Sequence, residues 1–402
     1  MPILIQSTLV PSIQHALLER NAVGRAFFAC EAHRLAVACR EMADRFARGG
    51  RLLAVGRLHS ATDAQHVSVE FVHPVIVGKR ALPAIDLSHA VQGGLTSVLR
   101  PDDIVMGFGP PGGDPVITDA LRVARGVGAQ TFALPGREGS YVIPGVSADP
   151  YIHQEIVEVL YHTLWETVHV FLEHRQAGHD VGASGFLYPY LGDAEQDTTA
   201  ILGEVADSIR AKAAMDEELR KQAAESAAMG IAEAAAAIRA RLSTGATILA
   251  FGNGGSATDA NDFALDCALP IKPRPAIPAM SLSTEPAVLT AIANDVGHET
   301  VFLRQVIAHG RRGDVALGIS TSGGSRNVLM ALEEARRRGM LTVALLGYDG
   351  GEIVRRGLAD IALVVSSDYI PRIQEVQASM YHTLIDALYD DFGEEADGGA
   401  AA

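Results

Sequence analysis

The feature that most constrains this chain is a similarity between its two halves. Residues 51–64 read RLLAVGRLHSATDA, and residues 247–260 read TILAFGNGGSATDA. Further matches follow in the same order in both halves; they pair 81–88 with 276–283, 102–113 with 313–324, 128–139 with 339–350, and 153–164 with 373–384. Because the repeat is as long as a whole domain, the sequence predicts two tandem copies of one fold, in contrast to a solenoid of short repeats.

Length and composition suit two domains of a cytoplasmic protein. At roughly 150 residues per domain, we expect a first domain at 1–180, a second at 181–392 and a disordered acidic tail at 393–402. A formal net charge of −15 without a Lys/Arg cluster argues against nucleic acid and membranes as partners. No signal peptide or membrane span is predicted. The three cysteines lack CxxC spacing, which fits a reducing cytoplasm.

Short apolar runs alternate with helical stretches in both halves. The runs lie at 52–56, 104–109 and 131–136, and at 248–252, 315–320 and 342–347. Helical patterns lie before them, at 13–48 and 195–243, and after them, at 151–173 and 371–390. Such alternation is typical of buried parallel strands, so the sequence predicts α/β architecture: two doubly wound, flavodoxin-like domains with long flanking helices.

Two loops of the second half carry glycines and hydroxyl groups. GNGGS (252–256) and ISTSGGSRN (319–327) each lie between a predicted strand and a predicted helix. In open α/β sheets, ligands bind at the carboxyl ends of the strands. Glycines let backbone amides approach a phosphate, and helix N-termini favour anions. Helix capping accounts for only one or two of the hydroxyls in the second loop, so these loops predict a phosphate site.

These loops, together with 281–306 and 372–382, resemble the sugar isomerase (SIS) domain of the phosphoheptose isomerase family. The resemblance implies an SIS fold and aldose–ketose isomerisation of a phosphosugar such as sedoheptulose 7-phosphate. The positions that match the family's phosphate contacts are Ser256, Ser320, Thr321, Ser322 and Ser325. Three more match its other substrate-binding positions, namely Asn253, Asp295 and Gln374, and His382 matches a catalytic position.

The second copy departs from the family at the catalytic base. After the shared DA dipeptide, the isomerases carry a His and, four residues later, the Glu that is taken to be the base. This copy has Asp262 and Asp266 there. Aspartate is one methylene shorter, and a displacement of about an ångström can cost roughly a hundredfold in rate. Asp266 is therefore a candidate base in an altered position.

The first copy keeps the residues that the second has lost. His66 and Glu70 match the family's His and Glu and share one helix face, while Gln154 and His162 match two positions on the last helix. The resemblance implies that Glu70 is the base and that His162 or His382 is its acid partner. In some of these isomerases the matching set binds zinc, which implies a zinc site of His66, Glu70, Gln154 and His162. We expect the helix at 60–72 to lie beside the last helix, with the four side chains converging.

The phosphate loops of the first copy are altered. GNGGS is replaced by GRLHS, and ISTSGGS by FGPPGGD. The carboxylate of Asp114 and the prolines, which lack N–H groups, are poor phosphate ligands. We therefore expect that this copy alone does not bind a phosphosugar.

Two functions fit this distribution of residues. The first is an isomerase with complementary half-sites, in which the second copy binds the phosphate and the first supplies the base. Because the family forms tetramers with interfacial sites, we then expect a homodimer of tandem chains, a pseudo-tetramer. The second is a non-catalytic scaffold or regulator that binds a phosphosugar or nucleotide-sugar, since relaxed selection would also remove different parts from each copy. Neither requires an organic cofactor.

Overall fold

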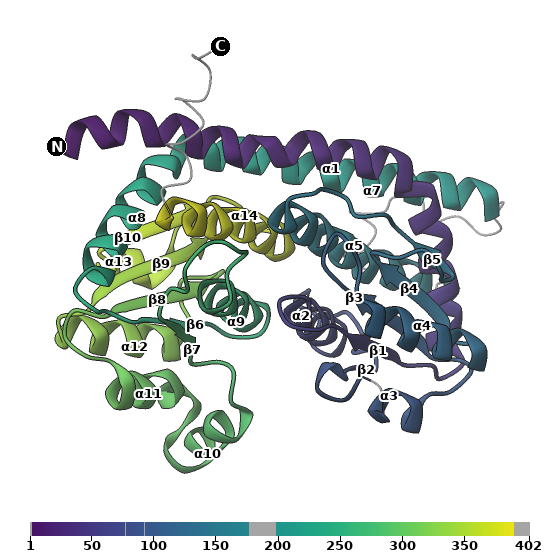
Figure 1. The fold of residues 1–402 in the computed structure, drawn as a ribbon. Helices are drawn as coiled ribbons and strands as arrows, with labels where there is room; N and C mark the ends of the chain where they lie inside the picture. The colour runs from purple at the N-terminus through teal and green to yellow at the C-terminus, as the bar shows by residue number, and fades with distance from the viewer. Residues whose placement is uncertain (1, 77, 92, 177–197, 390–402) are drawn as a thin grey trace. The chain divides into compact units, whose positions relative to one another are not determined.

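The computed structural model describes residues 2–76, 78–91, 93–176 and 198–389 (Figure 1). The chain divides into two compact units. The N-terminal unit is Ala22–Met215, and the C-terminal unit combines Met1–Asn21 with Asp216–Ala402. The boundary predicted between residues 180 and 181 and the predicted tail at 393–402 lie outside the described residues.

Each unit contains one parallel sheet of five strands. In the N-terminal unit the order is β2-β1-β3-β4-β5, with bounds β1 Leu52–Val55, β2 Ala84–Asp86, β3 Ile104–Phe108, β4 Gln130–Leu134 and β5 Tyr141–Val142. In the C-terminal unit it is β10-β9-β8-β6-β7, with bounds β6 Ile248–Phe251, β7 Ala279–Ser281, β8 Val315–Ser320, β9 Leu341–Gly347 and β10 Ile361–Val365. Numbered within each copy, both orders read 2-1-3-4-5, which is the flavodoxin-like order. The predicted fold class is confirmed.

The helices follow the predicted pattern with one difference. Those of the first half are α1 Pro2–Ala47, α2 Ser60–Val72, α3 Gly93–Val98, α4 Pro115–Val127 and α5 Pro150–Gln176. Those of the second half are α7 Thr198–Ser226, α8 Ala228–Leu242, α9 Gly255–Ala268, α10 Pro286–Val296, α11 Val301–His309, α12 Arg326–Arg337, α13 Gly351–Arg355 and α14 Ile370–Leu388. The helix predicted at 195–243 is two helices, α7 and α8, separated at Ala227. Alanine has high helix propensity, so the intrinsic preference of this residue does not account for the break.

None of the helices in the described residues is both long enough and apolar enough to cross a bilayer.

Alternate residues of the central strands face opposite sides of the sheet. In β1, Leu52 and Ala54 pack in a core formed with α1, α2 and α5. Leu53 and Val55 pack in a second core, formed with α4. A strand turns successive side chains to opposite faces, and helices cover both faces here. This explains why β1, β3 and β4 are apolar and buried throughout, without the alternation of a half-exposed strand.

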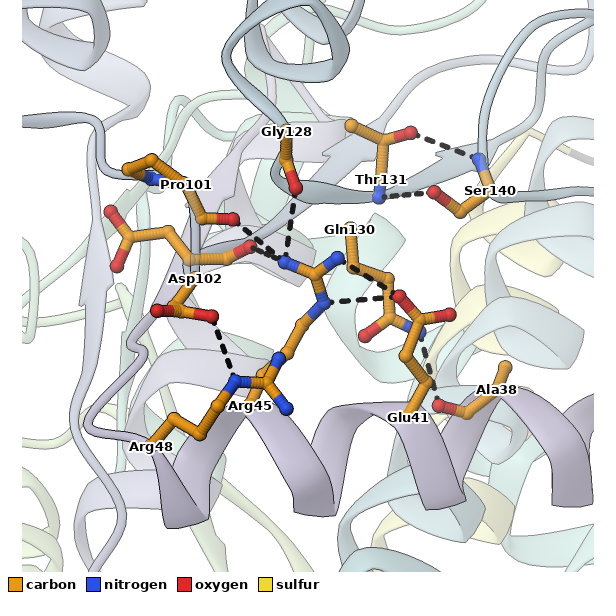
Figure 2. A network of polar contacts seen from close by, with 11 residues as sticks. Ala38, Glu41, Arg45, Arg48, Pro101, Asp102, Gly128, Gln130, Thr131 and Ser140 are labelled. Carbon is orange, nitrogen blue, oxygen red and sulfur yellow. Dashed lines mark hydrogen bonds and ion pairs between the residues drawn. The ribbon is translucent and has the colours of Figure 1, made fainter.

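A polar network fixes the end of α1 to the loops that precede β3 and β4 (Figure 2). The Arg45 guanidinium donates to the carbonyls of Pro101 at 2.8 Å and Gly128 at 3.1 Å. Arg48 pairs with Asp102 at 2.9 Å, and the Gln130 amide donates to a carbonyl within α1. These loops lie at the amino ends of their strands. The network therefore anchors the helix at the amino ends of the strands. Ligands of open α/β sheets bind at the opposite side, at the carboxyl ends.

The two copies differ most between their second and third strands. In the C-terminal unit, α10, a 3-10 turn at His298–Thr300 and α11 connect β7 to β8. In the N-terminal unit, a 3-10 turn at Ser88–Ala90 and the six-residue α3 make the same connection. The first copy therefore lacks the helix that carries Asp295.

Candidate functional site

The first phosphate loop of the C-terminal unit joins β6 to α9. The strand ends at Phe251 and the helix begins at Gly255. Gly254 has φ +59°, in the left-handed region that glycine adopts without strain. Ser256 lies in the first helical turn and is buried. This loop therefore presents a serine hydroxyl at a helix N-terminus, where an anion is favoured.

The second loop joins β8 to α12. Ser320 is the last residue of the strand, and its Oγ lies 3.2 Å from the Oγ of Ser325. Thr321 is half-buried, and Ser322 is exposed, with its Oγ accepting from the Gly324 amide at 3.2 Å. The strand β8 pairs directly with β6, so both loops leave the same edge of the sheet.

The two loops are tied together by their asparagines. The side chains of Asn253 and Asn327 exchange two hydrogen bonds, of 2.9 and 2.7 Å. The arrangement thus brings Asn253 and the five hydroxyl positions predicted as phosphate contacts to one pair of neighbouring loops.

The other two predicted substrate residues lie on other elements. Asp295 is exposed near the end of α10, where its carboxylate accepts from Asn294 at 3.0 Å. Its helix follows the edge strand β7, whereas the phosphate loops leave inner strands. Gln374 is buried in α14, two helical turns before His382. The structure places Gln374 on the same helix as His382 and leaves Asp295 at the border of the sheet.

A buried carboxylate–imidazole cluster joins α9 to α14. His382 Nε2 lies 3.4 Å from an oxygen of Asp262 and 3.4 Å from an oxygen of Asp266. The Tyr381 hydroxyl donates to Asp262 at 2.9 Å. Both aspartates are therefore within reach of the imidazole despite their short side chains, and the predicted base and acid of this copy are neighbours.

The matching cluster of the N-terminal unit joins α2 to α5, which pack together as predicted. The Nε2 atoms of His66 and His162 are 3.3 Å apart, and His66 Nε2 is 3.9 Å from Glu70 Oε1. All three side chains are buried. On the same two helices, the Gln154 amide nitrogen donates to Thr62 Oγ1 at 3.3 Å, one turn before His66.

The structure adds Glu158, which the sequence reasoning missed. Its Oε1 lies 3.9 Å from His66 Nδ1. His66, Glu158 and His162 bring one ligand atom each to within 4.8 Å of the others, and all three are buried. A signal was present, because Glu158 lies four residues after Gln154 and four before His162, on one face of α5. The family resemblance did not point to it, since the matching residue of the second copy is Ala378.

The donor set of this cluster suits zinc. Imidazole nitrogens and carboxylate oxygens are ordinary zinc ligands. With Zn–N distances of about 2.0–2.1 Å, two nitrogens on a tetrahedral ion are roughly 3.3–3.4 Å apart. The separation of 3.3 Å between His66 and His162 matches that edge. The residues present therefore fit the metal that the sequence led us to expect.

The loops of the N-terminal unit are filled by a side chain of the protein. The Asp114 carboxylate accepts from the amides of Val116 at 2.8 Å and Ile117 at 3.2 Å, at the N-terminus of α4. Arg57 pairs with the same carboxylate at 3.0 Å. The Asp114 carboxylate thus accepts from the same helix N-terminal amides that would otherwise face a phosphate.

A buried histidine forms hydrogen bonds with the backbone next to these loops. His153 Nε2 donates to the Gly109 carbonyl at 3.2 Å, and its Nδ1 accepts from the Val146 amide at 3.2 Å. Burial lowers the pKa of His153 from about 6.5 to about 4, and the bond to Gly109 offsets only part of that effect. The imidazole is therefore neutral at pH 7.

The fold and the loops define a tandem SIS-domain protein, and the SIS domain family model matches residues 214–347. Phosphoheptose isomerase of Helicobacter pylori (strain P12) is 50% identical over 149 residues, which cover 37% of this chain and 77% of that protein. Its counterpart in Thermodesulfovibrio yellowstonii is 40% identical over 188 residues, which cover 46% of this chain and 92% of that protein. The chain belongs to the phosphoheptose isomerase family.

A solved structure shares the fold over the whole chain. It is a putative tagatose-6-phosphate ketose/aldose isomerase from Clostridium novyi NT, with a TM-score of 0.55 and 12% identity. The match covers 98% of this chain and 97% of that chain. At this identity the likeness concerns the fold, and it agrees with two SIS-like domains in one polypeptide.

Proposed function

We propose that this protein interconverts the aldose and ketose forms of a phosphorylated sugar, and that the substrate is a seven-carbon phosphosugar such as sedoheptulose 7-phosphate. The observation that carries the proposal is the pair of buried hydroxyls, Ser256 and Ser320, at the carboxyl ends of neighbouring strands in the C-terminal unit. The identity of 50% to a phosphoheptose isomerase supports the choice of sugar.

Phosphate binding falls to the C-terminal unit. Hydroxyls of Ser320, Ser322 and Ser325 come from one loop, and Ser256 comes from the other. Hydrogen bonds to a charged phosphate are worth roughly 1.5–3 kcal/mol each. Several such bonds hold one end of the sugar firmly, so the reacting carbons are fixed relative to the acid–base groups.

The chemistry requires a base and an acid. A carboxylate removes the proton from the carbon beside the carbonyl, which forms an enediol, and returns it to the neighbouring carbon. An imidazole exchanges a proton with the sugar oxygens as the carbonyl moves. We assign the base to Glu70 because it has the length of the family's base, and the acid to His162 or His382. Asp266 is the alternative base, since it contacts His382 at 3.4 Å.

The same proposal includes zinc in the N-terminal cluster of His66, Glu70, Gln154 and His162. When bound, zinc would polarise the substrate carbonyl as a Lewis acid. A homodimer of tandem chains completes the proposal, because the family's sites draw on more than one SIS domain.

Proton exchange tests the proposal and separates the two bases. Purified protein is incubated with sedoheptulose 7-phosphate in D2O, and deuterium at the first two carbons is followed by NMR. We expect exchange with the wild type and with Asp266→Asn, and a loss of roughly 10²–10⁴-fold with Glu70→Gln. The reverse pattern would move the base to the C-terminal unit.

The second candidate is a non-catalytic phosphosugar-binding protein. One observation favours it: in the first copy, Arg57 and Asp114 pair with each other in the loops that match the phosphate loops of the second copy. Under this alternative, calorimetry would detect phosphosugar binding while no deuterium is incorporated with any sugar in a panel of aldose and ketose phosphates.

A further inference from the structure

The contact between the two phosphate loops of the C-terminal unit depends on one buried side chain, Asn327. It lies in the first turn of α12 and is only 2% exposed, whereas Asn253 is partly exposed. The Asn327 oxygen accepts from the Val328 backbone amide at 2.9 Å and from the Asn253 side-chain nitrogen at 2.9 Å. The Asn327 nitrogen donates to the Asn253 oxygen at 2.7 Å. Asn327 therefore ties the loop after β6 to the N-terminus of α12.

The bond from Val328 fixes the direction in which both side-chain amides point. A backbone N–H can only donate, so it must meet the oxygen of Asn327. Because the two asparagines exchange both of their bonds, the orientation of Asn327 also sets the orientation of Asn253. A side-chain amide has two N–H groups, and this exchange uses one of those of Asn253. The other N–H therefore has a fixed direction in the loop that leads to Ser256.

The first copy makes the matching connection with a charged pair. Asp114 accepts from an amide at the N-terminus of α4 at 2.8 Å and pairs with Arg57 at 3.0 Å. Arg57 aligns with Asn253, so in both copies the loop after the first strand is linked to the N-terminus of the next helix. The linking side chains differ in place and in charge. Asp114 is the N-cap residue of α4, whereas Asn327 lies two positions after Ser325, the N-cap residue of α12.

The neutral connection brings no negative charge to the N-terminus of α12, and Ser325 makes no side-chain cap there. A helix N-terminus attracts an anion, whereas a carboxylate beside it would repel a phosphate. We propose that Asn327 is a positioning residue of the phosphate site, which orients Asn253 and holds the two loops together without touching the substrate. The inference rests on the proposed function, because that function supplies the phosphorylated ligand.

Two substitutions of Asn327 test this role with inorganic phosphate and sedoheptulose 7-phosphate as ligands. Asn327→Ala removes the connection and should weaken the binding of both ligands roughly tenfold. Asn327→Asp keeps the acceptor for Val328 and the shape of the side chain but adds a negative charge, so it should weaken both by at least about a hundredfold. Calorimetry measures the affinities, and circular dichroism checks the fold. Asp114→Asn makes the reverse change at the matching connection and should leave both affinities unchanged.

A double-mutant cycle provides a readout that a general structural role would not move. If Asn327 acts through Asn253, the double variant Asn253→Ala/Asn327→Ala should bind the phosphosugar about as weakly as Asn253→Ala alone. Additive losses in the double variant, or wild-type affinity in both Asn327 variants, would overturn the inference.

Isomerisation is scored separately from binding, by NMR. A wild type that binds the phosphosugar without isomerising it would refute the proposed function alone. Active Asn327 variants with unchanged affinity would refute this inference alone, and a wild type that binds neither ligand would refute both.

Discussion

The two copies differ in what pairs with the backbone amides at the N-termini of α4 and α12. In each copy, two neighbouring strands end in loops that lead into a helix N-terminus. In the N-terminal unit, Asp114 accepts from those amides and pairs with Arg57. In the C-terminal unit, the matching contact between loops is the neutral pair Asn253 and Asn327, and Ser325 is the N-cap residue of α12. The comparison teaches that a helix N-terminus of this fold can be paired with an internal carboxylate in one copy and, under the proposed function, with the phosphate of a substrate in the other.

The largest expected effect lies in the serine-rich loop. Replacing both Ser320 and Ser322 by Ala should weaken phosphosugar binding by about 3–6 kcal/mol, or roughly 10²–10⁴-fold, because each loses a charge-assisted hydrogen bond. Calorimetric titration measures it, with Asp114→Ala as the control that should leave the affinity unchanged. Equal affinities for wild type and double variant would mean that the phosphate binds elsewhere.

Acid should destabilise the N-terminal unit through His153. Its pKa is about 4 when folded and about 6.5 when unfolded, so the unfolded state binds more protons between these values. The contribution is complete above about pH 6.5 and is lost as the pH falls towards 4, by about 3 kcal/mol. Burial lowers the pKa of His169 in the same unit, which acts in the same direction.

The single tryptophan makes this prediction measurable for one unit. Trp165 is fully buried in the N-terminal unit, so its fluorescence follows the unfolding of that unit. The variant His153→Ile carries the residue that the second copy has at Ile373. It should flatten the dependence of unfolding free energy on pH between 4 and 6.5, even though it lowers stability at pH 7. An unchanged slope would exclude His153 as its source.

A glycine in each second loop gives a smaller, matched contrast. Gly323 has φ +58°, and a Cβ there would lie 2.1 Å from the Gly350 carbonyl oxygen. Gly323→Ala should destabilise the C-terminal unit by about 2–3 kcal/mol. At the matching Gly112 a Cβ meets no atom within 4 Å, so Gly112→Ala should change the unfolding free energy by less than about 0.5 kcal/mol. Thermal denaturation compares them, and similar shifts would contradict the different packing of the two loops.

The smallest effect separates stability from binding at one aligned position. Asp114 caps α4, whereas the matching Ser325 makes no side-chain cap on α12. Asp114→Ala should cost about 1 kcal/mol of stability and leave phosphosugar affinity unchanged. Ser325→Ala should leave stability unchanged and weaken affinity. Denaturant titration and calorimetry on both variants would show the crossed pattern, and a parallel loss in both would remove the distinction.

The fold could be predicted from sequence because it depends on local patterns. Buried apolar runs identified the inner strands, and the internal repeat required the same strand order twice. The break at Ala227 could not be predicted, since alanine favours helix. The assignment of Met1–Asn21 to the C-terminal unit likewise depends on contacts remote in sequence.

The candidate site residues could be predicted from the sequence to a similar degree. Positions aligned to family motifs located the serines, Glu70 and His162 on the correct elements, because strand–loop–helix junctions are encoded locally. Glu158 was missed because no motif marks it, and its significance comes from the approach of α2 to α5. The sequence indicated only part of the role of Asp114. Its negative charge argued against phosphate binding, but its ion pair with Arg57 became apparent only in the structure.

The divided C-terminal unit has a consequence for synthesis on the ribosome. Its first segment, Met1–Asn21, contains the buried side chains of Leu9, Ile13 and Leu17. Asn21 accepts a hydrogen bond from the Arg220 guanidinium at 2.8 Å, so this partner residue is synthesised only after Ala22–Met215 has been made. At roughly 5–20 residues per second, this takes about 10–40 s. The leading apolar segment stays exposed for that time, a target for chaperones, while the continuous N-terminal unit folds first. Splitting the gene at residues 177–197 would therefore separate the second domain from a piece of itself.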